Sequence, residues 1–297
     1  MTPAWLWAVF TVLAALGQTA RNTMQRELTA NLGAVGATHV RFLFGFPFAA
    51  LFLIAVAAIT RQPLPNPTIY FWLWLLTGAV AQILGTALML LLMEERSFVI
   101  ATAYIKTEPV FVAVFGLLFL NDFLTVPIMI AIAVCTAGVV LISLNPGSGF
   151  ASGRATLLGL ASGAFFGLSA IGFRGAILSL GMPNYLLAST FTLTTGLAVQ
   201  SALLTTYLAI RTPTVLYALM RVWRQASVTG FVGALASQLW FLAFALATAA
   251  SVRTLGLVDV IFAQAVSRFL FKHHTTPREY TGIGLLLTGA IMLVAAH

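Results

Sequence analysis

The stretch YFWLWLLTGAVAQILGTALMLLLM, from Tyr70 to Met93, contains no charged side chain and is long enough to cross a bilayer as one helix. The whole chain has the same character, with 60% hydrophobic residues, 7% charged residues and a mean hydropathy of +1.01. A soluble domain carries about a quarter charged residues, so water could not solvate such a surface. The composition therefore predicts an integral membrane protein.

Ten apolar runs of this kind, separated by loop-like punctuation, predict an all-α integral membrane protein with ten transmembrane helices. We expect the first five at Ala4–Ala20, Val35–Ile59, Tyr70–Met93, Phe98–Leu120 and Val126–Leu144. We expect the second five at Ala155–Leu178, Tyr185–Ile210, Val228–Ala250, Val252–Phe271 and Tyr280–Ala296. The first run has no basic segment before it and no small-residue cleavage site after it, so it is interpreted as a retained span. A short helix in the membrane interface is expected over Thr212–Gln225.

The two halves of the chain resemble one duplicated unit. The segment TEPVFVAVFGLLF, Thr107–Phe119, aligns without a gap with VDVIFAQAVSRFL, Val258–Leu270, and this alignment places Glu108 on Asp259. Because each unit holds an odd number of helices, the second copy must enter the membrane with the opposite orientation, as in many secondary transporters. The expected organisation is two inverted five-helix repeats and a linker, at residues 1–144, 154–297 and 145–153.

Polar and ionisable side chains inside a span are costly in lipid and are therefore candidates for function. Lys106 and Glu108 lie near the middle of the expected fourth span, about 200° apart around a helix, so they should not pair with each other. Tyr104 shares a face with Glu108, and Pro109 predicts a kink beside them. A structural role stays open, in which Lys106 and Glu108 each pair with a neighbouring helix, for example with Arg41.

Other spans contribute further candidates. The segments GAVAQIL and GALASQL align Gln82 with Gln238 after one insertion, and these amides with Trp240 suit an amphipathic organic ligand. Plain helix packing is the competing interpretation of Trp240, and His39 could face either a cavity or the core. The candidate substrate-binding residues are His39, Arg41, Gln82, Tyr104, Lys106, Glu108, Gln238, Trp240 and Asp259.

Several function classes lack their signatures. The sequence has no phosphate loop, zinc-protease motif, paired-cysteine motif or serine-hydrolase motif, so no catalytic residue, metal or cofactor is expected and energy should come from gradients. Its basic residues are scattered singly, which argues against nucleic acid. An integral-membrane enzyme acting on lipid is the less favoured alternative, because its nearest approach to a reactive cluster is His273, His274 and Glu279 on one loop.

The pattern resembles the drug/metabolite transporter superfamily, specifically its ten-helix EamA-type transporters, which include the YddG-like amino-acid exporters. The resemblance rests on the five-plus-five layout and on HVRFLFGFPFAALFL, TEPVFVAVFGLLFLND and CTAGVVLI, at His39–Leu53, Thr107–Asp122 and Cys135–Ile142. It implies two inverted repeats around a central cavity, and by position it places there Gln82, Tyr104, Glu108, Gln238, Trp240 and Asp259. Many members have Gly-Glu where this chain has Asn121 and Asp122, so a role for that acid is in doubt.

We expect a secondary transporter in a cell membrane, namely the bacterial inner membrane, that exports aromatic or neutral amino acids by alternating access. The substrate carboxylate would lie near Lys106 or Arg41, and its ammonium group near Glu108 or Asp259, where proton coupling is also conceivable. A multidrug or organic-cation exporter is the alternative, for which Lys106 would be an obstacle. Orientation stays open: the positive-inside count, with Arg61, Arg174 and Arg253 assigned to even loops, opposes the family likeness.

Overall fold

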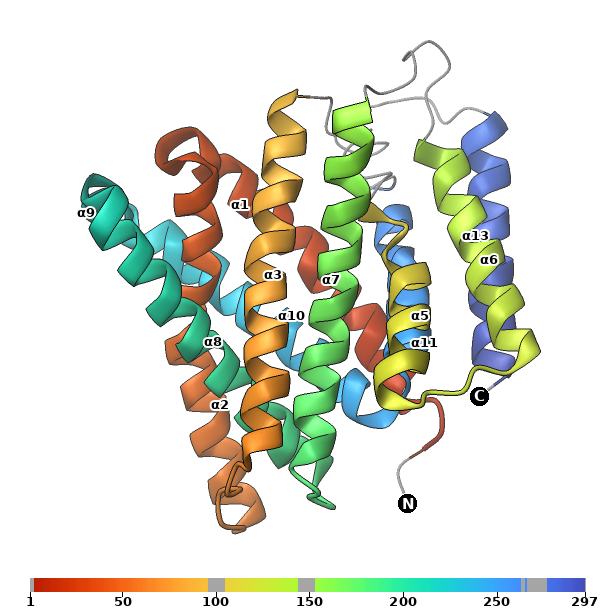
Figure 1. Cartoon of the computed structure of the whole chain (residues 1–297), viewed down its shortest axis with the longest axis horizontal. Coiled ribbons are helices and arrows are strands. Elements are labelled where there is room, and N and C mark those ends of the chain that lie inside the picture. Colours follow the sequence, from red (N-terminus) through yellow and green to blue (C-terminus); the bar gives the residue numbers. More distant parts are fainter. Residues whose placement is uncertain (1–2, 96–104, 144–152, 263–264, 266–276, 297) are drawn as a thin grey trace.

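The computed structural model describes residues 3–95, 105–143, 153–262, 265 and 277–296. Within these residues the chain forms eleven α-helices and one short 3-10 helix, with no strand. The helices form a bundle in which some stand nearly upright in the view, while others run obliquely (Figure 1). The expectation of an all-α protein is therefore confirmed.

In the first half the helices are α1 (Leu6–Leu43), α2 (Gly45–Thr60), α3 (Ile69–Glu95), α5 (Glu108–Leu120) and α6 (Val126–Ser143). Helix α1 is interrupted at Gly33, whose φ of 65° and ψ of 173° are not helical. Glycine tolerates this backbone because it has no Cβ to clash. The first expected span lies before this interruption. The second begins after it, in the last part of α1, and continues through Phe44 into α2.

In the second half the helices are α7 (Gly153–Ser179), α8 (Tyr185–Arg211), α9 (Pro213–Arg221), α10 (Trp223–Leu246), α11 (Ala249–Leu255), the 3-10 helix η1 (Gly256–Val258) and α13 (Pro277–Ala295). Helix α9 occupies the segment expected to form a short interfacial helix. Its place at a membrane surface stays a prediction.

Five of the described helices are long and apolar enough to cross a membrane: Val35–Thr60, Ile69–Met89, Thr156–Ser179, Tyr185–Arg211 and Trp223–Leu246. They coincide with the expected second, third, sixth, seventh and eighth spans. Large apolar side chains such as Leu51, Ile54 and Ile59 are exposed on their outer faces. Such a surface is stable in lipid and not in water.

The expected fourth and ninth spans differ from the structure. Helix α5 begins only at Glu108, after a turn at Lys106 and Thr107, so Pro109 lies in the first helical turn instead of kinking a continuous helix. The expected eighth span also ends early, at Leu246, and the ninth is divided into α11 and η1, with Asp259 directly after them. Pro109 suits the start of α5, because an N–H group in the first turn of a helix would have no helical hydrogen-bond partner in any case.

The bundle is held by pairs of helices from opposite halves of the chain. Helix α3 packs on α7, α1 on α10, α2 on α8, α5 on α11 and α6 on α13; Figure 1 shows α3 beside α7 and α6 beside α13. These last four helices stand nearly upright in the view, while α1, α8 and α10 run obliquely. Glycines allow the closest approaches, since a Cβ on Gly172 would come within 2.5 Å of the backbone nitrogen of Gly78. Small residues serve the same purpose at helix contacts in many membrane proteins.

Candidate substrate site

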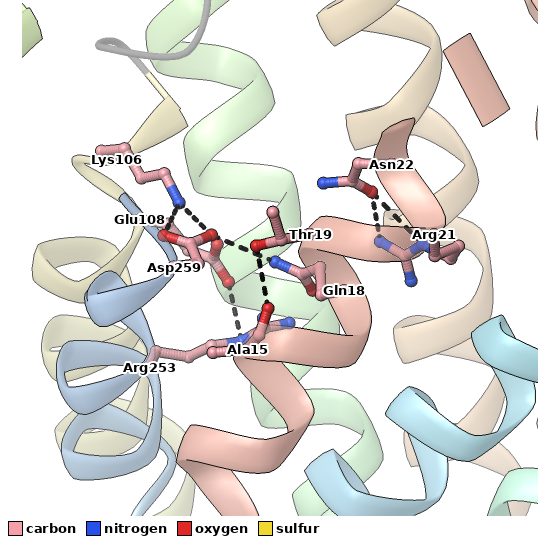
Figure 2. Close-up of polar contacts among 9 residues, drawn as sticks. All are labelled: Ala15, Gln18, Thr19, Arg21, Asn22, Lys106, Glu108, Arg253 and Asp259. Carbon is pink, nitrogen blue, oxygen red and sulfur yellow. Dashed lines mark hydrogen bonds and ion pairs between the residues drawn. The ribbon is translucent and has the colours of Figure 1, made fainter. Parts of the chain in front are cut away.

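Two ion pairs connect the start of α5 with the break that follows α11. Lys106 Nζ lies 2.5 Å from Asp259 Oδ2, and Arg253 Nε lies 3.0 Å from Glu108 Oε1. The four side chains, which we call the ionic cluster, converge in Figure 2, where Gln18 of α1 also donates a 3.5 Å hydrogen bond to Asp259. Each acid is thus paired with a base from the other half of the chain.

Local backbone structure places both acids at helix breaks. Glu108 is the first residue of α5, where the partial positive charge of the helix N-terminus favours a carboxylate. Asp259 follows η1, and its backbone N–H donates to the carbonyls of Gly256 and Leu257. Discontinuous helices of this kind bring backbone ends and charges together inside membrane transporters.

Aromatic rings hold the guanidinium of Arg253. Its Cζ lies 4.7 Å from the ring centre of Trp240 and 5.5 Å from that of Phe244. Such cation–π contacts stabilise a cation that is removed from water. Gly256 lies against the same indole, where a Cβ would collide with the ring. Trp240 therefore helps to position Arg253, the ion-pair partner of Glu108.

A narrow cavity of about 10 Å³ lies beside Arg41. Its wall combines amides, a hydroxyl and aromatic rings from both halves of the chain, including Gln82, Gln200, Ser237, Phe173 and Phe241. Gln200 Nε2 donates to Gln82 Oε1 at 2.8 Å, so the two amides bridge α3 and α8. The cavity has room for about one water molecule, and an organic solute could enter only if the helices separated.

The first half of the chain matches a known protein family. Residues 5–144 form an EamA-like transporter family domain. This match and the apolar helices indicate a multi-pass membrane protein, and the matched family suggests transport of small substrates. In fold the whole bundle is similar to a solved crystal structure, with a TM-score of 0.70 and 12% identity over 98% of this chain and 96% of the other. No curated protein matches the sequence significantly.

The expected site residues lie at several separate places in the bundle. Lys106, Glu108, Trp240 and Asp259 meet at the ionic cluster, whereas Arg41 and Gln82 line the cavity. Lys106 and Glu108 bind partners on other elements, although Glu108 pairs with Arg253 and not with the suggested Arg41. Tyr104, His273 and His274 lie outside the described residues, and Glu279 belongs to the first turn of α13.

His39 and Gln238 take part in separate contacts between helices. The His39 side chain is fully buried, and its Nε2 lies 3.0 Å from Thr205 Oγ1 of α8. Gln238 Nε2 of α10 donates to Thr190 Oγ1 at 2.9 Å. Both side chains tie α8 to a neighbouring helix, and neither lines the cavity.

Two arginines that the sequence interpretation assigned to loops are buried in helices. Arg253 belongs to the ionic cluster, and Arg174 of α7 forms an ion pair with Asp122 at 3.2 Å. Asp122, which departs from the family pattern, therefore has an ion-pair partner in this chain. The apolar residues around each arginine were the available signal, because a cation in such a run needs an internal partner. Because neither arginine lies in a loop, neither should be counted when the positive charges of the loops on the two sides of the membrane are compared.

Proposed function

We propose that the chain is a secondary transporter that exports small organic metabolites by alternating access, with aromatic or neutral amino acids as the substrate class, as in YddG-like exporters. The observation that supports this most directly is the pair of crossed contacts in the ionic cluster. Glu108 and Asp259, which the repeat aligns, each bind a base from the opposite half. Contacts of this kind can hold the two halves together in one state and release them in another.

The packing of the helices favours two inverted repeats, over residues 1–144 and 154–297, as the moving units. If the repeats are exchanged, the contact of α3 with α7 becomes that of α10 with α1. The pairs α2 with α8, α5 with α11 and α6 with α13 are each converted into themselves. An arrangement that is nearly unchanged by this exchange can open to either side of a membrane at similar energy.

The proposed transport cycle requires the helices to separate, because the cavity of about 10 Å³ is too small for an amino acid. Separation would loosen the ion pairs of Glu108 and Asp259, each of which loses its base from the other half. Either acid could then take up a proton, so proton coupling is part of the proposal. The bacterial inner membrane is the proposed location.

The ionic cluster favours amino acids over organic cations as substrates. Both acids already hold a cation from the protein, so a cationic drug would have to displace Lys106 or Arg253 before it could bind. Leaving either base without its acid inside the bundle would be strongly unfavourable. A zwitterion carries no net charge, so its binding would leave no uncompensated charge in the bundle.

The test uses purified protein in proteoliposomes loaded with a panel of labelled amino acids, with and without a proton gradient. We expect saturable release of aromatic or neutral amino acids, and Glu108→Gln should reduce the rate by more than about ten-fold. Arg221→Gln, on the exposed end of α9, is the matched control and should transport normally. Release of none of the panel, or an unchanged rate in Glu108→Gln at every pH, would contradict the proposal.

A further inference from the structure

We propose that Arg21 and Arg41 together bind an anionic group of the substrate, so that the transported molecule is an organic carboxylate or an anion of similar chemistry. This inference rests on the proposed transport function and specifies the substrate chemistry of the same central region. It moves the substrate's negative charge away from Lys106, which Asp259 already neutralises.

The two arginines meet although they lie on opposite sides of the kink in α1. A Cβ on Gly233 of α10 would be 3.2 Å from Arg21 Cδ and 3.9 Å from Arg41 Cγ, so both stems lie against the same glycine. Arg41 also experiences electrostatic repulsion from Arg21 and Arg253. Positive charge is therefore concentrated at one place between α1, α10 and α11.

Neither arginine is neutralised by an acid of the described chain. Arg21 is only 5% exposed and donates to the neutral Oδ1 of Asn22, from Nη2 at 2.8 Å and from Nε at 3.3 Å (Figure 2). Its Nη1 is buried without a hydrogen-bond partner, and so is Nε of Arg41. The neighbouring carboxylates of Glu108 and Asp259 are already engaged.

A cation whose N–H groups are buried without a counter-ion is costly, and a site that keeps two of them is prepared for an anion from outside. Guanidinium groups match carboxylates particularly well, because their parallel N–H groups can donate to both oxygens. Ionic attraction of this kind would also be strong inside the bundle, where water is scarce.

The cavity beside Arg41 indicates what the rest of the substrate looks like. Gln82, Gln200 and Ser237 offer hydrogen-bonding groups, and Phe173 and Phe241 form an aromatic wall with ring centres 4.9 Å apart. A carboxylate attached to an apolar or aromatic body fits this combination. Both acids of the ionic cluster already have a base, so an amine on the substrate should contribute little to binding.

The first experiment measures thermal unfolding of the purified protein in detergent with three probes: 3-phenylpropionate, phenethylamine and inorganic phosphate. We expect 3-phenylpropionate to raise the melting temperature and to compete with phenylalanine, whereas phenethylamine should do neither. Stabilisation by phosphate alone would keep the anion site and assign it to phosphate-bearing solutes. Stabilisation by phenethylamine alone would overturn the proposal.

The second experiment compares Arg21→Gln and Arg41→Gln with Arg41→Lys and with the exposed control Arg221→Gln. Each Gln variant should weaken 3-phenylpropionate binding by at least about ten-fold while raising the melting temperature without ligand, because an uncompensated buried charge is removed. Arg41→Lys should bind with intermediate affinity, and the control should match the wild type. Unchanged affinity in both Gln variants, or lower ligand-free stability with full affinity, would show a structural role instead.

These measurements separate the anion site from the proposed transport function. Arginine-dependent anion binding without amino-acid release would keep the anion site and exclude amino-acid export. Amino-acid release that is unchanged when either arginine is replaced would support amino-acid export and exclude the anion site.

Discussion

Arg174 and Arg253 lie on neighbouring helices, and their buried positive charges are stabilised in different ways. Arg174 donates from Nε and Nη2 to the two oxygens of Asp122 and from Nη1 to the carbonyls of Phe244 and Ala247. Arg253 has one carboxylate contact, 3.0 Å from Glu108, in which neither Nε nor Oε1 meets hydrogen-bond geometry. Arg253 and Glu108 therefore attract each other by charge, without an aligned hydrogen bond between Nε and Oε1. Two aromatic rings provide further contacts to Arg253.

Burial does not explain this difference. The side chains of Arg174 and Asp122 are 10% and 13% exposed, and those of Arg253 and Glu108 are 13% and 14% exposed. What differs is the number of aligned hydrogen bonds, together with the backbone around them. Arg174 caps the carbonyl end of α10, whereas Glu108 and Arg253 lie at the broken α5 and α11. We therefore expect the ion pair of Arg174 and Asp122 to persist and that of Arg253 and Glu108 to rearrange more easily.

The largest effect should come from breaking the aligned pair. Arg174→Gln leaves Asp122 buried without its cation and removes the cap from α10, so we expect a loss of about 3–5 kcal/mol in the free energy of unfolding. Thermal and denaturant unfolding in detergent would measure it. Arg253→Gln should cost less, about 1–2 kcal/mol, because Lys106 remains near Glu108 and few aligned bonds are lost. Equal losses in the two variants would remove the distinction.

An intermediate effect is expected from disturbing the aromatic support of Arg253. Gly256→Ala places a methyl group against the indole of Trp240 and must displace it, which should cost about 1–3 kcal/mol. Gly284→Ala on the exposed face of α13 is the matched control, since nothing lies within 4 Å of its added Cβ. The control should be neutral or slightly stabilising. A neutral Gly256→Ala would mean that the indole can move freely.

The smallest effect should be the coupling between Arg253 and Trp240 themselves. A double-mutant cycle with Arg253→Gln and Trp240→Phe should give a coupling energy of about 0.5–1 kcal/mol, because phenylalanine retains part of the cation–π attraction. The corresponding cycle for Arg174→Gln and Asp122→Asn should give at least twice that value. A larger coupling at Trp240 than at Asp122 would reverse the comparison.

Much of the fold could be predicted from hydrophobicity alone. The expected span Tyr185–Ile210 differs by one residue from α8, and Val126–Leu144 by one residue from α6. The failures lie at Lys106–Pro109 and around Gly256, where apolar runs continue but the helices stop. Hydropathy measures transfer into lipid and carries little information about where a helix is interrupted inside a protein. Only Pro109 marked one of these places in the sequence.

Hydropathy was enough to predict a membrane protein, and the alignment of the two halves was enough to identify Glu108 and Asp259 as matching acids, because charged groups among apolar residues are costly wherever they lie. Which base each acid binds was decided by the tertiary structure. Arg253 and Lys106 reach their acids across about 150 residues of chain, through the docking of α5 on α11. Within the described residues no ion pair joins Arg21 or Arg41 to an acid, because a counter-ion depends on which helices pack together and not on neighbours along the chain.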